Sequence, residues 1–273
     1  RFAGSPLALY AALRSRARAN HGAVVWTGSQ WVLSFSPELF FAVTDGTVTT
    51  RPMKGTAARA ADPVVDAAVV DALRTDPKQQ AENVMIVDLL RNDLGRIAQL
   101  GSVAVPELFE AHTYPTIHQL TSTVTARLRD GLDALDVVAN CFPCGSVTGA
   151  PKISAMRVLA GLEDTPRGVY CGSIGAFLPT GDASLNVAIR TMVLDEQRST
   201  ATLGLGSGLV ADSTGEAEWQ ECLDKAAFLQ LGTRVELFET MRADPVTGAG
   251  RLDLHLARLT ASADVFGLPH EVQ

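Results

Sequence analysis

Hydrophobic and polar positions repeat with two different periods along this chain, which predicts a mixture of helices and strands. Six segments have apolar residues three or four positions apart, as in helices that bury one face: 6–19, 63–75, 77–93, 132–141, 151–161 and 215–230. Asp62 and Asp76 precede Pro63 and Pro77 at the start of two of these segments. An aspartate N-cap followed by proline in the first turn predicts a sharp helix start.

Strand-like runs occupy much of the remaining chain. They are rich in β-branched and aromatic residues and are bounded by turn-forming residues: 23–27, 31–35, 39–43, 47–51, 116–128, 169–178, 184–194 and 199–205. The runs come in clusters and do not alternate one by one with helices. This order favours an α+β fold with mostly antiparallel sheet.

The pattern changes near residue 232. Residues 233–273 begin a new strand–turn–helix pattern that stops at Gln273. About 40 residues are too few to bury an independent core. We therefore interpret 1–232 as one domain and 233–273 as the truncated start of a second. Because the first residue is Arg1, we expect the chain to be a fragment.

Composition narrows the class of protein. The chain has 273 residues with 47% apolar residues, so a sizeable core can be buried. Its net charge of −7 argues against nucleic-acid binding, which needs clustered excess Lys and Arg. No apolar run approaches the roughly 18–20 residues that span a bilayer, and residues 1–20 do not resemble a signal peptide. We expect a cytoplasmic protein.

The cysteines raise a separate question. Four cysteines in a chain of this length do not form a disulfide framework. Cys141 and Cys144 have the C-x-x-C spacing of a redox or half-zinc motif. No second pair follows at metal-ligand spacing, so reduced thiols are the favoured reading.

Acidic residues suggest a metal site. Glu218, Glu221 and Lys225 share one face of the predicted 215–230 helix, and Glu82 lies in the 77–93 helix. Two helices that each present a glutamate could bind Mg²⁺, which takes one or two carboxylates besides water and substrate oxygens. A solvated helix face gives the same spacing, and spacing alone favours it.

Two further segments suggest anion binding. The predicted strand 184–194 places Arg190 among apolar residues, on the same face as Asn186, Ala188 and Met192. Its guanidinium either forms an internal salt bridge or binds a substrate carboxylate. The glycine-rich run 204–210 either aims backbone N–H groups at an anion or forms an ordinary turn.

A similar question arises at residues 144–152, "CGSVTGAPK". This segment lacks the P-loop spacing, so we reject a phosphate loop there.

Eight collinear segments together resemble the chorismate-binding domain shared by anthranilate, isochorismate, salicylate and aminodeoxychorismate synthases. The segments are "SPELF" (36–40), "RPMKGTAAR" (51–59), "AENVMIVDLLRNDLGR" (81–96), "IHQLTSTV" (117–124), "FPCGSVTGAPKISAM" (142–156), "GVYCGSIGAF" (168–177), "NVAIRTM" (186–192) and "GLGSGLVADSTGEAEWQECLDKA" (204–226). The resemblance implies antiparallel sheets packed face to face with outer helices. It also implies that the domain's first strands are missing.

The resemblance gives Lys54 and Glu38 catalytic roles. The position of Lys54 is typically Ala in anthranilate synthases, whereas aminodeoxychorismate synthases carry Lys. This lysine is implied to add to C2 of chorismate as the C4 hydroxyl leaves, after which ammonia enters at C4. Glu38 matches the general acid that protonates the departing hydroxyl. Both roles need shifted pKa values, which burial and neighbouring charges can supply.

Binding roles follow from the same resemblance. Glu82 and Glu221 match direct Mg²⁺ ligands, and Glu218 matches a water-mediated one. The residues implied to bind the substrate are Arg190, Tyr170, Gly206, Gly208, His118, Ser122, Thr148 and Lys225. Among these, His118 and Ser122 are implied to line the ring pocket.

The tail resembles the start of a fold-type IV aminodeoxychorismate lyase, a pyridoxal-phosphate (PLP) enzyme. The carriers are "LFETMR" (237–242) and "LDLHLARLTASADVFGL" (252–268), in which Arg258 matches a contact to the PLP phosphate. The Schiff-base lysine would lie downstream of these residues, so this chain is not expected to perform the lyase step.

We therefore expect the synthase component of aminodeoxychorismate formation, in p-aminobenzoate and folate biosynthesis. No glutaminase nucleophile motif is present, so a glutamine amidotransferase subunit or domain would supply the ammonia. The alternatives are anthranilate synthase component I, an isochorismate or salicylate synthase, and a non-catalytic chorismate-binding or assembly module.

Overall fold

The structure, a computed structural model, describes residues 4–17, 19–113, 117–211, 213–229, 243–244, 248–249, 253–254, 256–257 and 260. The chain divides into two units, Arg1–Ala227 and Phe228–Gln273. The described part of the second unit contains one strand pair, β12 (Ala243–Asp244) with β13 (Gly248–Ala249).

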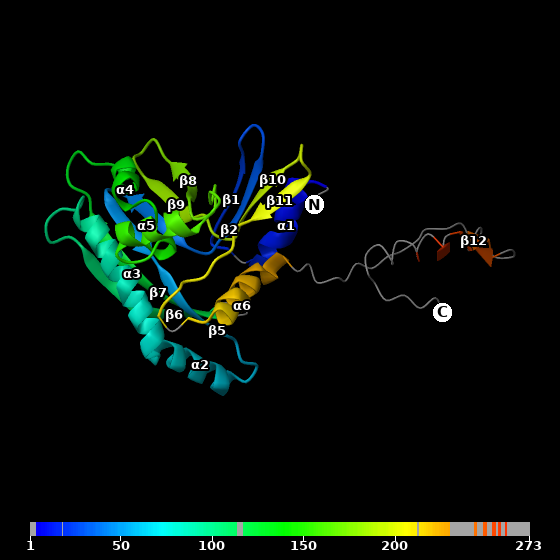
Figure 1. Ribbon diagram of the computed structural model, residues 1–273, viewed down its shortest axis with the longest axis horizontal. Helices are drawn as coiled ribbons and strands as arrows, with labels where there is room; N and C mark the ends of the chain where they lie inside the picture. The colour runs from blue at the N-terminus through cyan, green and yellow to red at the C-terminus, as the bar shows by residue number, and fades with distance from the viewer. Residues whose placement is uncertain are drawn as a thin grey trace. The chain divides into compact units, whose positions relative to one another are not determined.

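The first unit contains helices and strands in mixed order (Figure 1). Its helices are α1 (Pro6–Ala17), α2 (Pro63–Thr75), α3 (Pro77–Gly95), α4 (Ala134–Cys141), the short 3₁₀ helix η1 (Gly145–Val147), α5 (Lys152–Leu162) and α6 (Gly215–Ala226), with the 3₁₀ turn η2 (Ala227–Leu229) across the boundary of the units. Its strands are β1 (His21–Trp26), β2 (Trp31–Ser36), β3 (Leu39–Thr44), β4 (Thr47–Arg51), β5 (Met53–Ala58), β6 (Ala104–Thr113), β7 (Ile117–Arg127), β8 (Ser173–Phe177), β9 (Ala183–Val187), β10 (Thr191–Asp195) and β11 (Thr200–Leu203).

The strands form two antiparallel sheets. One sheet has the order β1-β2-β10-β11. The other has seven strands in the order β5-β7-β4-β3-β9-β8, with β6 also paired to β7. The predicted α+β fold with antiparallel sheets is confirmed. Asn186 of β9 joins the sheets, because its Nδ2 donates to the His21 carbonyl (2.6 Å) and to Ser34 Oγ (3.2 Å) of the smaller sheet.

The starts of α2 and α3 lie where the sequence predicts them. The Asp62 carboxylate accepts hydrogen bonds from the backbone N–H groups of Val64 and Val65. Asp76 caps α3 in the same way. These caps satisfy donors that the first helical turn leaves without partners. Asp76 is both the last cap of α2 and the first cap of α3, so one helix follows the other directly.

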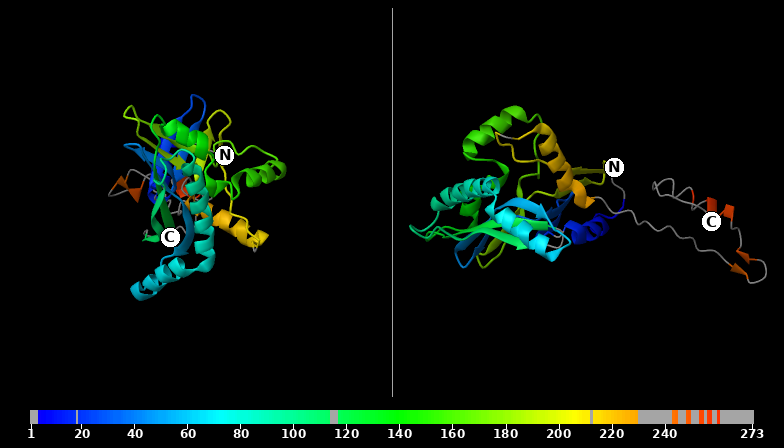
Figure 2. Two further views of the ribbon diagram at one scale, coloured as in Figure 1. Left: turned by 90° about the vertical axis from the view of Figure 1, so that its left-hand side faces the viewer. Right: turned by 90° about the horizontal axis from the view of Figure 1, so that it is seen from below.

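The core of the first unit lies between α3 and the seven-stranded sheet. Leu90 and Leu94 of α3 are fully buried, together with Val48 of β4 and Val124 of β7. Full burial of such a side chain stabilises a fold by roughly 1.5–3 kcal/mol. This packing holds α3, which carries Glu82, against the sheet. Both views in Figure 2 place α5 and α6 on one side of the strands.

Two predicted strands need correction, and two strands were not predicted. The predicted strand 184–194 is broken between β9 and β10, because the chain passes from one sheet to the other at residues 188–190. The predicted strand 169–178 begins only at Ser173, after a turn. Strands β5 and β6 lie in none of the strand runs predicted from the sequence. No helix in the part of the chain that the structure describes is long and apolar enough to cross a membrane.

Candidate active site

Glu38 is a buried acid between β2 and β3. Only 4% of its surface is exposed, and Oε1 has no hydrogen-bond partner among the described residues. Its backbone is held by Ser36 Oγ, which accepts from the Glu38 N–H (3.2 Å), and by the Val187 N–H, which donates to the Glu38 carbonyl (3.1 Å). Burial raises the pKa of Glu38 to about 7, although Ser146, Lys54 and Lys225 each lower it. Glu38 can therefore carry a proton near neutral pH.

Lys54 lies in a β-bulge of β5. The register between β5 and β7 shifts between Met53 and Thr56, so Lys54 and Gly55 form the irregular part of the strand. Gly55 has φ +94°, which a residue with a side chain rarely adopts. Its carbonyl accepts a hydrogen bond from Gln119 Nε2 (2.8 Å). Bulges redirect side chains, and this one sets the direction of Lys54.

The glycine-rich run lies between Tyr170 and Lys54. A Cβ added at Gly206 would stand 2.5 Å from Tyr170 Oη, and one added at Gly208 would stand 3.3 Å from Lys54 Nζ. Side chains at these two positions would therefore crowd the groups on either side. The ordinary-turn interpretation of this run does not explain such close approach.

Lys225 connects α6 to the glycine run. Its Nζ lies 2.6 Å from Glu221 Oε1 and donates to the Gly206 carbonyl (2.8 Å). Its positive charge also acts on Glu38. The predicted alignment of Glu221 and Lys225 on one helix face is therefore confirmed.

Glu218 differs from an ordinary solvated carboxylate. Its Oε1 accepts a hydrogen bond from Ser213 Oγ (2.6 Å), which is the largest cause that holds its pKa below the ordinary value. Oε2 is buried and has no hydrogen-bond partner among the described residues. The charge of Lys78 on α3 also acts on Glu218. Glu82 lies one helical turn after Lys78 on the same helix.

These three glutamates fit a hard cation in the chemistry of their donors. Carboxylate oxygens are the ligands that Mg²⁺ prefers, and the partnerless Oε2 of Glu218 is an acceptor that a cation would satisfy. Within the described residues, no three acidic, His or Cys side chains lie close enough to hold a metal ion. Mg²⁺ commonly uses only one or two carboxylates, with water and substrate oxygens as its other ligands. The donor set therefore suits a site completed by substrate.

Arg190 lies at the break between β9 and β10 and not inside a strand. Its backbone has φ +48°, and its carbonyl accepts from the Phe35 N–H (3.0 Å). Burial lowers the pKa of its guanidinium. No ion pair joins this side chain to any acid in the described residues, so the internal salt bridge is not found there. A half-buried, unpaired guanidinium suits a carboxylate ligand.

The loop after α4 contributes a residue that the sequence analysis overlooked. Ser146 in η1 lowers the pKa of the Glu38 side chain, and its Oγ lies 3.3 Å from Cys144 Sγ. Thr148 donates to the carbonyls of Cys144 (3.2 Å) and Gly145 (3.3 Å), and its predicted contact with substrate stays a prediction. It therefore shapes this loop. The only sequence signal for Ser146 was its place in segment 142–156, one of the segments that resemble the chorismate-binding domain.

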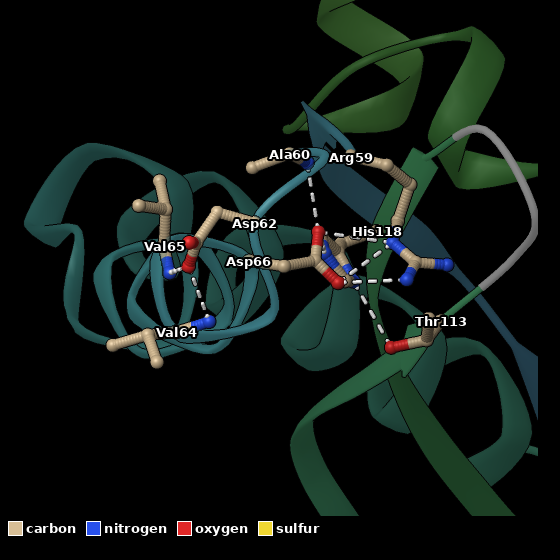
Figure 3. Close-up of polar contacts among 8 residues, drawn as sticks. All are labelled: Arg59, Ala60, Asp62, Val64, Val65, Asp66, Thr113 and His118. Carbon is tan, nitrogen blue, oxygen red and sulfur yellow. Dashed lines mark hydrogen bonds and ion pairs between the residues drawn. The ribbon is translucent and has the colours of Figure 1, made fainter.

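His118 and Ser122 of β7 both have protein partners. His118 lies between Asp66 and Thr113, as Figure 3 shows. Ser122 Oγ donates to Asn83 Oδ1 of α3 (2.6 Å) and accepts from the Phe109 N–H (3.1 Å). Their predicted place in a ring pocket stays a prediction.

Several other sequence interpretations concern side chains near this loop. Lys152 is tied to Asp93 (2.6 Å) and to the Cys141 carbonyl (2.7 Å), which leaves it unsuited to a phosphate. Cys141 and Cys144 are free, buried thiols, and burial raises the pKa of each to about 12.

Arg258 lies outside the described residues, so its predicted PLP contact is untested.

The contacts bring one set of predicted residues together. Lys54 and Tyr170 meet the glycine run from different elements, and Lys225 binds its carbonyl. The charges of both lysines act on Glu38. An amine, a protonated acid and exposed backbone groups in one place can support nucleophilic attack with protonation of a leaving group.

Comparison with known proteins agrees with this geometry. The profile of the chorismate binding enzyme family matches residues 1–231. An aminodeoxychorismate synthase of Streptomyces griseus is 47% identical over 224 residues, which are 82% of this chain and 31% of that protein. Aminodeoxychorismate synthase component 1 of Klebsiella aerogenes is 48% identical over 194 residues, 71% of this chain and 43% of that protein. The chain thus spans less than half the length of these curated relatives.

A solved structure of a related enzyme has a similar fold. The crystal structure of anthranilate synthase component I from Streptococcus pneumoniae TIGR4 superposes with a TM-score of 0.75 at 39% sequence identity. The alignment covers 82% of this chain and 49% of that one. Sequence and fold agree, and the chain belongs to the chorismate binding enzyme family.

Proposed function

We propose that this chain carries the catalytic domain of an aminodeoxychorismate synthase component I, which converts chorismate and ammonia to 4-amino-4-deoxychorismate. The single observation that carries the proposal is Lys54, an amine held in a β-bulge against Gly208. Its charge acts on the buried acid Glu38. The identity of 45–48% to curated aminodeoxychorismate synthases supports the proposal.

The reaction has two displacements. The neutral amine of Lys54 attacks C2 of chorismate, the ring double bonds shift, and the bond from C4 to its hydroxyl breaks. Protonated Glu38 gives its proton to the departing hydroxyl, which leaves as water. Ammonia then attacks C4, the double bonds shift back, and the C2–N bond to Lys54 breaks. The enzyme is regenerated once Glu38 regains a proton and Lys54 is again a neutral amine.

Substrate binding would rest on Arg190, on the glycine run and on a bound Mg²⁺. Arg190 offers a half-buried guanidinium to one carboxylate of chorismate. Tyr170 and the backbone of Gly206 and Gly208 border the same region. Glu82, Glu218 and Glu221 would hold Mg²⁺, which when bound supplies positive charge for the other carboxylate. Glu221 would then exchange its contact with Lys225 for the metal.

The proposal also covers the source of the ammonia and the residues after 232. We expect a glutamine amidotransferase subunit or domain to supply ammonia, because component 1 is the name of the related synthases. The residues after 232 are proposed to begin a lyase domain that would use the product. Support for this part comes only from the sequence of residues 237–268, since the family profile ends at residue 231.

Product identification tests the function. The protein is incubated with chorismate, Mg²⁺ and ammonium, and the product is identified by liquid chromatography and mass spectrometry. Aminodeoxychorismate is the expected product. Anthranilate would assign the activity of the structurally similar synthase and contradict the proposed role of Lys54, and isochorismate or salicylate would do the same.

A further inference from the structure

The imidazole of His118 is held at both of its nitrogens. His118 lies on β7 with 1% of its surface exposed. Its Nε2 lies 2.8 Å from Asp66 Oδ1 of α2, and its Nδ1 lies 3.0 Å from Thr113 Oγ1 of β6 (Figure 3). A flip of the ring would break both hydrogen bonds. The orientation of this ring is therefore fixed by two separate elements.

Asp66 is itself held as a carboxylate. Arg59 Nε donates to both of its oxygens (3.0 and 2.8 Å), Arg59 Nη2 lies 2.7 Å from Oδ2, and the Ala60 N–H donates to Oδ1 (2.8 Å). The hydrogen bond from Arg59 is the largest cause that holds the pKa of Asp66 well below its ordinary value, and His118 adds to it. An ionised carboxylate only accepts hydrogen bonds.

The charge of Asp66 has a consequence for His118. Because Asp66 cannot donate, Nε2 must carry the proton of their shared hydrogen bond. In the neutral ring, Nδ1 is then the acceptor and Thr113 is the donor. The threonine hydroxyl can also accept, so it suits the charged ring as well. Asp66 thus selects one tautomer, and Thr113 adapts to it.

The local fold gives Asp66 little freedom. It lies in the first turns of α2, where its N–H donates to the Asp62 carbonyl (2.8 Å) and Asp62 caps the helix start. Arg59 follows β5 directly, and β5 pairs with β7 so that Ala57 faces His118. Strand β5 also carries Lys54, three residues before Ala57. The Arg59–Asp66–His118 chain therefore braces the strand of the proposed nucleophile.

We propose that Asp66 is a positioning residue, which fixes the tautomer and orientation of His118 and thereby the ring pocket beside Lys54. This inference rests on the proposed function, because the resemblance to chorismate-converting enzymes puts His118 in that pocket. A different reading is that Asp66 and Arg59 only dock α2. The two readings differ in what they predict for the imidazole nitrogens.

The test observes His118 directly. The protein is labelled with ¹⁵N-histidine, and the imidazole nitrogens of His118 are assigned by comparison with His118→Gln. In the wild type we expect a protonated Nε2 and an unprotonated Nδ1 near pH 8. In Asp66→Asn the amide can donate or accept, so a mixture of tautomers is expected. The exposed aspartate Asp71, on the same helix, gives the matched control Asp71→Asn, which should resemble the wild type.

Thr113→Val gives a second test that leaves α2 and Arg59 untouched. It should keep the Nε2–H tautomer, because Asp66 selects it. A change to the Nδ1–H tautomer in Thr113→Val would overturn the proposal, and so would a wild-type spectrum in a folded Asp66→Asn. If Asp66→Asn does not fold, the Thr113→Val spectrum decides between the two readings.

Kinetics complete the experiment. With chorismate, Mg²⁺ and ammonium, kcat of Asp66→Asn should fall about tenfold or more, and kcat of Asp71→Asn should stay within twofold of the wild type. Equal kcat in both variants would overturn the positioning role. The spectra need no substrate, so they judge this inference even if the product shows that the proposed function is wrong.

Discussion

The Nζ atom of Lys54 lies against the backbone of Gly208, so that a Cβ added at Gly208 would stand 3.3 Å from it. The two residues are 154 positions apart in the sequence. One lies in a bulge of β5, and the other lies in the glycine run after β11.

Gly208→Ala should impair catalysis without unfolding the protein. The added methyl group must displace the end of the Lys54 side chain, so kcat should fall about tenfold, which corresponds to about 1.4 kcal/mol in the barrier. Gly215→Ala is the matched control, because a Cβ at Gly215 meets nothing within 4 Å. Steady-state kinetics and thermal unfolding of both variants check this. An unchanged kcat in Gly208→Ala would show that the contact is unimportant.

The protonation of Glu38 predicts the pH dependence of the reaction. Because its pKa is about 7, the acid form is present below that pH, and kcat/KM should decline as pH rises through about 7. Ser146 lowers this pKa, so Ser146→Ala should move the decline to higher pH. Glu38→Gln should remove most of the activity. A pH profile that does not move in Ser146→Ala would contradict this assignment.

Glu38 also links stability to pH. Its pKa rises from 4.5 in the unfolded chain to about 7 in the fold, so the folded state binds the extra proton between these values. The corresponding stability, about 3 kcal/mol, is fully present below pH 4.5 and is lost as pH rises through about 7. Urea unfolding of the wild type and Glu38→Gln at pH 5 and pH 8 measures this difference. The wild type should lose more stability than the variant between the two pH values.

The buried pair of Lys152 and Asp93 should matter for stability. Their side chains are 11% and 5% exposed, and Asp93→Ala would leave a buried ammonium without its counter-charge. We expect a loss of roughly 3 kcal/mol or more in the free energy of unfolding. Asp88→Ala on the same helix breaks a pair whose acid is 62% exposed, and should cost less than about 1 kcal/mol. Similar losses in the two variants would refute the argument.

Metal dependence tests the role of the glutamates. A chelator should abolish activity, and added Mg²⁺ should restore it. Glu82→Gln and Glu221→Gln should each raise the Mg²⁺ concentration needed for half-maximal activity about tenfold or more, because each loses a ligand charge. Asp224→Asn, an exposed neighbour on α6, should not. Activity that survives chelation would remove Mg²⁺ from the account.

The sequence predicted local features well and long-range contacts poorly. The Asp-Pro starts of α2 and α3 were predicted because their capping groups are adjacent in the chain. The break at Arg190 was missed because its residues have ordinary strand propensity, and only the passage between two sheets interrupts the strand. The role of Ser146 beside Glu38 depends on a contact between distant loops, which no local pattern encodes.

In the candidate site, too, the residues could be predicted from the sequence but the contacts between distant segments could not. Resemblance to a family led to Lys54, Glu38 and Lys225. The structure places both lysines against one glycine run, and their charges act on Glu38. The bulge that directs Lys54 is held by Gln119 of β7, which pairs with Thr56 and donates to the Gly55 carbonyl, and this position arises only from strand register. Register was not readable from the β5 sequence, because this strand itself was not predicted.

The most direct test of the account is the product that Lys54→Ala forms from chorismate, Mg²⁺ and ammonium. If Lys54 is the nucleophile that opens C4 to ammonia, aminodeoxychorismate formation should fall by about 100-fold or more while the variant stays folded. Arg198→Ala, which removes a cation that is 82% exposed between β10 and β11, should retain activity. Wild-type rates of aminodeoxychorismate formation in Lys54→Ala would contradict the proposed mechanism.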